Sequence, residues 1–234
     1  YTWKNKVVTI PGHGPNANEI VLLTAHMDSI STSPNTIAPG AEDNASGISA
    51  LMEAAKLFRF FKFDRTIKII FFTGEEQGLL GSAAYVADHP EELDNIVGVV
   101  NLDMFGYDSD DDRCFELHIG TLAESHLVGS CFTNVIDNYN LDLSYDFITN
   151  GAIPYSDHAS FWNVGVGSIE VLENLFYHPD LGCRGRTDGN PYYHTVNDKI
   201  EHMNLPVTHA IAQAGIGTAA SLALPMGRCF ATDP

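Results

Sequence analysis

Residues 67–76 read IKIIFFTGEE, and this stretch predicts the fold class. Its mostly apolar, β-branched and aromatic run is typical of a strand buried on both faces of a parallel sheet. Two adjacent carboxylates, Glu75 and Glu76, follow the run directly. Two further apolar runs also end in polar side chains, at His26 and Asp103. Ligands of open α/β sheets bind beyond the carboxyl ends of the strands, so these side chains stand where such a fold has its site.

Strand patterns alternate with helical patterns along the rest of the chain. We expect Ser156 to cap a short helix and Pro206 to open the last one. The predicted helices are 45–60, 79–87, 122–139, 158–163 and 209–224. The predicted strands are 7–10 and 20–25, as a hairpin or edge pair, then 67–73, 96–103, 115–119 and 168–171, with 145–155 irregular and 175–193 a long loop. This alternation predicts one α/β domain over residues 1–234, with a mostly parallel mixed sheet sandwiched between helices.

The composition excludes several classes of partner. The chain has 30 acidic against 12 basic residues and a formal net charge of −18. Nucleic acids and anionic membranes attract Lys/Arg surfaces, so neither is expected to bind. The sequence also lacks an apolar run of about 18 residues, the length of a transmembrane helix. We expect a monomeric protein that does not associate with membranes.

The cysteines bear on the compartment. Cys114, Cys131, Cys183 and Cys229 include no Cys-x-x-Cys pair, so a zinc ribbon or a thioredoxin-like site is not predicted. Their even number permits two disulfides in three possible connectivities, and buried or free thiols are the alternative. Low lysine content and loops rich in Asn, Asp, Ser and Gly favour a secreted, extracellular enzyme.

The polar residues at the strand ends have the chemistry of a metal site. Asp28 follows His26 by two residues, as in a carboxylate that holds the second ring nitrogen of a metal-binding histidine. Asp43 precedes a predicted helix, where it could cap the helix or bridge two metals with its two oxygens. Of Glu75 and Glu76, one could bind metal and the other act as general base. Each residue alone also has an ordinary interpretation, as a polar strand end or a surface turn.

Six motifs in one order carry a family resemblance. They occupy residues 24–29, 38–47, 74–76, 102–104, 156–160 and 194–195. With them the sequence resembles the dizinc exopeptidase family of bacterial secreted leucyl aminopeptidases and glutamate carboxypeptidase, which has glutaminyl cyclases as relatives. The resemblance extends over nearly the whole chain and implies a zinc exopeptidase-like fold.

The resemblance also implies two Zn²⁺ ions as cofactors and a role for each site residue. The implied metal ligands are His26, Asp43, Glu76, Asp103 and His194. Asp43 would bridge the ions, with Glu76 and His194 completing one site and His26 and Asp103 the other. Glu75 would be the general base and Asp28 would orient His26. The Asp43–Asn44 peptide bond is expected to be cis, and Asn44, although in a sequon, is expected to be buried.

The implied activity is that of an aminopeptidase. Its substrate would be the N-terminus of a peptide or protein, with a preference for large hydrophobic residues such as Leu or Phe. The chain's candidates for an apolar substrate pocket are Met104, Ile153, Tyr155, Leu172, Phe176 and Tyr193. Tyr155 is also a candidate to polarise the scissile carbonyl.

The sequence also allows other functions. The segment 150–155 lacks the disulfide loop of one close relative type, and the loop before His194 is longer and contains Arg184 and Arg186. Either arginine could bind a substrate carboxylate, as in a carboxypeptidase or dipeptidase. Alternatively they pair with local carboxylates such as Asp180 or Asp188. A one-zinc glutaminyl cyclase and a non-catalytic scaffold are further alternatives, which the complete set of five ligands disfavours.

Overall fold

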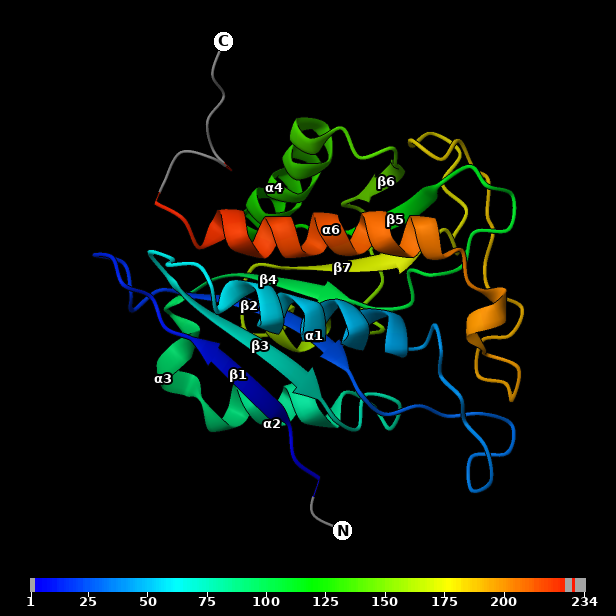
Figure 1. Ribbon diagram of the computed structural model, residues 1–234, viewed down its shortest axis with the longest axis horizontal. Helices are drawn as coiled ribbons and strands as arrows, with labels where there is room; N and C mark the ends of the chain where they lie inside the picture. The colour runs from blue at the N-terminus through cyan, green and yellow to red at the C-terminus, as the bar shows by residue number, and fades with distance from the viewer. Residues whose placement is uncertain (1–2, 226–228, 230–234) are drawn as a thin grey trace.

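The protein is built on one seven-stranded mixed sheet with the strand order β1-β3-β2-β4-β7-β5-β6 (Figure 1). The computed structural model describes residues 3–225 and residue 229. β2, β3, β4 and β7 run parallel to one another, β1 and β5 run antiparallel to their neighbours β3 and β7, and β6 is parallel to β5. The strands are β1 (Lys6–Ile10), β2 (Ile20–His26), β3 (Thr66–Phe72), β4 (Ile96–Leu102), β5 (Cys114–His118), β6 (Ser144–Ile148) and β7 (Ser168–Glu173).

Helices cover both faces of the sheet. The helices are α1 (Ala45–Phe58), α2 (Leu80–Asp88), α3 (Pro90–Leu93), α4 (Ala123–Tyr139), α5 (His158–Trp162) and α6 (Leu205–Leu222), with a 3₁₀ turn η1 (Ile200–His202). α1, α4 and α6 form one layer, and α2 and α5 pack together behind the sheet (Figure 1). The predicted α/β fold, with a mixed sheet between helices, is confirmed. None of the helices in the described part of the chain is long and apolar enough to cross a membrane.

The central strand β2 explains why the sheet needs both layers. All seven of its residues are buried, as expected for a parallel strand inside a sheet. Val21 and Leu23 face the core under α1 and α6, whereas Ile20 and Leu22 face the second core with Phe72 and Phe161. Because successive side chains alternate between the faces, the side chains of one continuous apolar run pack into the cores on both faces of the sheet.

Several predicted elements were wrong. Residues 7–10 and 20–25 do not pair with each other: β1 pairs with β3, and β3 separates it from β2. The stretch 145–155 is not wholly irregular, because β6 runs through Ser144–Ile148 at the sheet edge. α6 begins at Leu205 rather than at residue 209, with Asn204 as its N-cap.

The expected disulfides are present. Cys114 is bonded to Cys183 and Cys131 to Cys229, one of the three connectivities that the sequence allows. The first bond ties the start of β5 to the long loop after β7. The second ties α4 to the chain beyond α6. Free cysteines, the alternative, do not occur among the described residues.

Candidate metal centre

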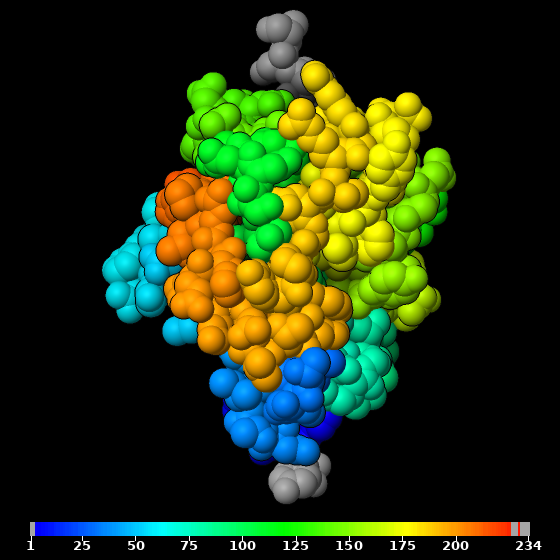
Figure 2. Space-filling view, turned by 90° about the vertical axis from the view of Figure 1, so that its right-hand side faces the viewer, coloured from blue at the N-terminus to red at the C-terminus, as the bar shows by residue number. Residues whose placement is uncertain are grey.

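All five predicted metal ligands meet at the carboxyl edge of the parallel strands. His26 is the last residue of β2, Asp103 directly follows β4 and Glu76 follows β3. Asp43 lies just before α1, and His194 lies in the segment between β7 and α6. Figure 2 views the molecule from this end, where the loop after β2 (blue), the loop after β7 (yellow) and the chain leading into α6 (orange) lie close together. The parallel sheet thus gathers side chains that are far apart in the sequence.

Asp43 stands between the two histidines. One carboxylate oxygen, Oδ1, lies 3.1 Å from His26 Nε2, and the other, Oδ2, lies 3.1 Å from His194 Nε2. His26 Nε2 is also 3.1 Å from Asp103 Oδ1, and His194 Nε2 is 3.0 Å from Glu76 Oε2. The donors therefore form two sets of one histidine and two carboxylates that share Asp43. The Asp43–Asn44 peptide bond is cis, as the resemblance implied.

The tautomer of His26 fits a cation in the first set. Its Nδ1 lies 3.0 Å from the carbonyl oxygen of Asp28, so Nδ1 carries the proton and donates it there. With a cation bound, a neutral His26 would offer it the lone pair of Nε2, which lies beside two carboxylate oxygens, those of Asp43 and Asp103. Three electron-rich atoms converging on one point match the nitrogen and oxygen ligands of a divalent transition metal.

Asp28 acts differently from the prediction. Its carbonyl oxygen, rather than its carboxylate, accepts the hydrogen bond from His26, and the carboxylate is 3.8 Å from Nδ1. The two carboxylate oxygens instead accept the backbone N–H groups of Glu75 and Glu76, each at 3.2 Å. Asp28 therefore links the end of β2 to the turn that carries both glutamates.

The electrostatics are those of a site with excess negative charge. Burial would lower the pKa of His26, but Asp103 and Asp43 raise it well above its ordinary value. Burial, together with the charge of Asp103, raises the pKa of Glu75 to about 9. Two bound divalent cations would offset this repulsion and bring Glu75 toward the range of a general base.

Three buried residues for which the sequence predicted no role in the metal centre brace the ligands. Asp198 accepts the backbone N–H groups of Glu42 and Asp43 at 3.0 and 3.1 Å, which fixes the chain at the shared carboxylate. Ser156 Oγ donates to Asp103 Oδ2 at 2.6 Å, so Ser156 is not the N-cap of α5, a position that Asp157 holds. The buried Glu42 accepts the N–H groups of Gly106 and Tyr107. Asn44 is buried, as expected, and caps α1.

A cavity of about 200 Å³ opens beside the ligands. Its lining includes Leu175 and Glu170, neither of which was predicted, and all six predicted pocket residues: Met104, Ile153, Tyr155, Leu172, Phe176 and Tyr193. Tyr155 and Tyr193 are 69% and 44% exposed, whereas Met104 and Leu172 are buried. The tyrosines therefore form the mouth of the cavity and the buried residues its inner wall.

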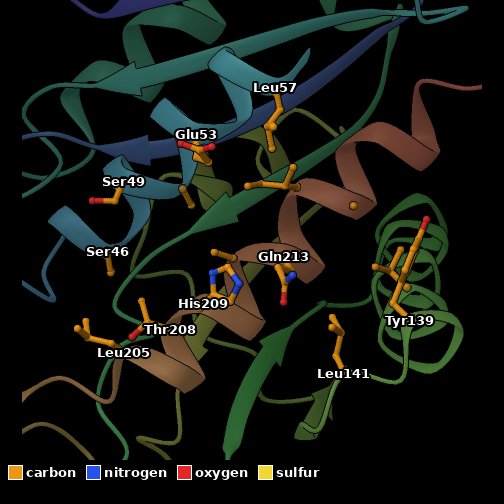
Figure 3. Close-up of a pocket in the computed structure, with 15 residues that line it drawn as sticks. Ser46, Ser49, Glu53, Leu57, Tyr139, Leu141, Leu205, Thr208, His209 and Gln213 are labelled. Atoms are coloured by element: carbon orange, nitrogen blue, oxygen red, sulfur yellow. The ribbon is translucent and has the colours of Figure 1, made fainter. Parts of the chain in front are cut away.

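Other depressions lie away from the ligands. Arg184 and Arg186 border a separate hollow near Cys114, and Arg186 pairs with Asp112 at 3.7 Å rather than with Asp180 or Asp188. A larger cavity of about 570 Å³ lies between α1, α4 and α6 (Figure 3). Its lining is mostly apolar and includes the polar residues Glu53 and His209 (Figure 3), and none of the predicted site residues contributes to it.

Comparison with known proteins agrees with this geometry. The family model for peptidase family M28 matches residues 5–219. The chain belongs to peptidase family M28. This M28 chain is 34% identical over 189 residues to aminopeptidase YwaD of Bacillus subtilis, covering 80% of this chain and 37% of that protein. It is 33% identical to leucine aminopeptidase 1 of Trichophyton equinum, covering 91% of this chain and 56% of the relative.

Solved structures of the M28 fold extend the comparison. The zinc aminopeptidase BSAP from Bacillus subtilis superposes with a TM-score of 0.71 at 31% identity, covering 92% of this chain and 48% of that one. A Porphyromonas gingivalis glutaminyl cyclase shares the fold alone, with a TM-score of 0.66 at 22% identity over 92% of this chain and 76% of that one. The M28 chain thus spans between about a third and just over half of the length of these aminopeptidases.

Proposed function

We propose that this chain is the catalytic domain of a dizinc aminopeptidase that hydrolyses the first peptide bond of peptides or proteins. The observation that carries the proposal is the position of Asp43, whose two oxygens each face a different histidine at 3.1 Å. Asp103 completes the set around His26, and Glu76 completes the set around His194. Two nitrogen and oxygen donor sets that share a carboxylate are suited to two zinc ions. The named aminopeptidases among the relatives support the same activity.

The chain's own groups supply the acid–base steps. When bound, the zinc ions would lower the pKa of a water molecule and polarise the substrate carbonyl. Glu75 lies at the edge of the cavity, with a carboxylate oxygen 4.0 Å from His26 Nε2. It would take a proton from the attacking water and pass it to the leaving amine. Asp28 positions Glu75 through the backbone N–H group. Tyr155, which lines the cavity, would donate a hydrogen bond from its hydroxyl group to the carbonyl oxygen.

The cavity walls favour large side chains. Met104, Leu172 and Phe176 offer apolar surface next to the donor groups, so Leu or Phe at the substrate N-terminus would bury apolar area there. The carboxypeptidase alternative gains no support, because Arg184 and Arg186 border another hollow. Two disulfides are compatible with an extracellular protein, and we propose that this protein is secreted.

The test is the Glu75→Gln variant. Gln keeps the size and polarity of the side chain but cannot accept the proton of water. We expect kcat on Leu-p-nitroanilide to fall by about 10²–10⁴-fold, the usual contribution of a general base, while the zinc content measured by mass spectrometry stays at the wild-type value. Wild-type turnover in this variant would overturn the role of Glu75. Wild-type protein that binds no metal, or that keeps its activity in a chelator, would overturn the metallopeptidase itself.

A further inference from the structure

Glu170 lies at the inner end of the cavity. It belongs to the parallel part of the sheet, on β7, where it is 2% exposed yet contributes to the cavity lining beside the donor residues. Leu172, two residues further along β7, lines the same cavity, because alternate strand residues share a face. The exposed Tyr155 and Tyr193 form the mouth, so Glu170 forms part of the floor.

No cation of the described chain neutralises this carboxyl group. Its one ion-pair neighbour there is His158, whose Nε2 is 3.5 Å away. That nitrogen lies 2.9 Å from the carbonyl oxygen of Ile153, to which it donates its proton, and burial lowers the pKa of His158 to about 3. His158 is therefore neutral, and Oε2 of Glu170 has no hydrogen-bond partner. An unpaired buried carboxyl group is costly, so its energy would drop if a ligand brought a cation to it.

We propose that Glu170 makes the pocket selective for N-terminal residues with a long apolar stem and a cationic end, namely Lys and Arg. This inference rests on the proposed aminopeptidase function and concerns the substrate that the same site takes. The methylene groups of Lys or Arg would lie along Met104, Leu172 and Phe176, and the charged end would meet Glu170 at the floor. Shorter apolar residues such as Leu still fit the walls but leave the carboxyl group unpaired.

The charges around the cavity agree with this selectivity. Burial, followed by the negative charges of Asp103 and Glu75, raises the pKa of Glu170 well above its ordinary value. Bound zinc ions would offset the charges of Asp103 and Glu75, and an ammonium or guanidinium group at Glu170 would in turn favour its ionised carboxylate. The formal net charge of −18 attracts a substrate cation at long range.

The test compares two substrates that differ only in the cationic end. Lys-p-nitroanilide and norleucine-p-nitroanilide have the same carbon chain, so the ratio of their kcat/KM values isolates the contribution of the charge. We expect the zinc-loaded wild-type enzyme to prefer Lys by about tenfold or more, and Glu170→Gln to lower the ratio by a similar factor with norleucine turnover retained. Glu53→Gln, on the exposed side of α1, is the matched control and should leave the ratio unchanged.

The role of Glu170 and the aminopeptidase function can fail separately in this test. A wild-type enzyme that prefers norleucine, or an unchanged ratio in a folded Glu170→Gln variant, would overturn the role of Glu170 while leaving the aminopeptidase intact. Failure of zinc-loaded wild type on Lys, norleucine and Leu substrates alike would overturn the proposed function, and this inference with it. If Glu170→Gln does not fold, the wild-type ratio and the Glu170→Met variant, which should prefer norleucine, provide the test.

Discussion

Asp198 is the residue whose substitution most directly tests how the centre is held together. Its carboxylate is 3% exposed, and its two oxygens accept the backbone N–H groups of Glu42 and Asp43. The Asp198→Asn variant keeps the shape but replaces one oxygen with an NH₂ group. That NH₂ group then faces a backbone N–H, so two donors meet and one buried N–H loses its acceptor.

The expected magnitude follows from these two contacts. A buried donor left without a partner costs about 1–3 kcal/mol, and a hydrogen bond to a charged acceptor contributes about 1.5–3 kcal/mol. These costs overlap, so we expect Asp198→Asn to lose about 2–3 kcal/mol of unfolding free energy. For a chain of this size the melting temperature should fall by about 5–10 °C. Because the displaced backbone belongs to Asp43, zinc affinity or activity should fall by about 10–100-fold.

The assay combines thermal unfolding with zinc loss to a competing chelator. Asp188→Asn is the matched control, because Asp188 also accepts two backbone N–H groups, those of Ser109 and Asp110, but in an exposed loop outside the cavity. This control should change the melting temperature little and zinc affinity not at all. An Asp198→Asn variant with wild-type melting and chelator resistance would refute the bracing role.

Three further predictions concern the metals, the disulfides and the buried histidine. Mass spectrometry should find about two zinc ions per chain, and about one in His194→Ala, because that change breaks one donor set only; two ions in the variant would contradict the assignment of His194. The double variant Cys114→Ser/Cys183→Ser opens a link between residues 69 apart, so denaturant unfolding should reveal a loss of about 3–4 kcal/mol. Burial lowers the pKa of His158 to about 3, so the unfolded state binds the extra proton and wild type loses stability as the pH falls from 6.5 toward 3. His158→Gln has no such group to protonate. The difference in unfolding free energy between wild type and this variant should therefore shrink between about pH 7 and about pH 4. A difference that grows would show that His158 is charged in the folded state.

The parts of the fold and site that could be predicted from sequence are those set by local pattern. An apolar run followed by a polar residue predicts a buried parallel strand and a ligand at its carboxyl end. That rule found His26, Glu76 and Asp103, and the structure brings them together with Asp43 and His194. The pocket candidates were chosen for their closeness in sequence to site residues, and all six line the cavity beside the donor groups.

The parts that could not be predicted lie outside regular strands and helices or depend on how distant strands pair. Alternation of side chains applies only inside a strand, and β2 ends at His26, so the carboxylate of Asp28 turned toward the backbone of Glu75. β1 lies at the sheet edge, and its pairing with β3 rather than β2 is decided by topology. Asp198 lies four residues beyond His194 in a segment without regular structure, where no periodicity marks a role.

Strand β7 contains both a residue that the local sequence pattern explains and one that it does not. One of its faces supplies Leu172, which an apolar pattern identifies as wall or core, and Glu170, which the same pattern would dismiss as an interruption. A charged residue inside a fully buried strand is costly unless something pairs with it, and the described chain offers only the neutral His158. Glu170, which interrupts the apolar pattern, is therefore more informative about the substrate than the apolar residues around it. The apolar residues of β7 are favourable to bury, whereas burying the unpaired carboxyl group of Glu170 is unfavourable. A cationic ligand would offset that unfavourable free energy.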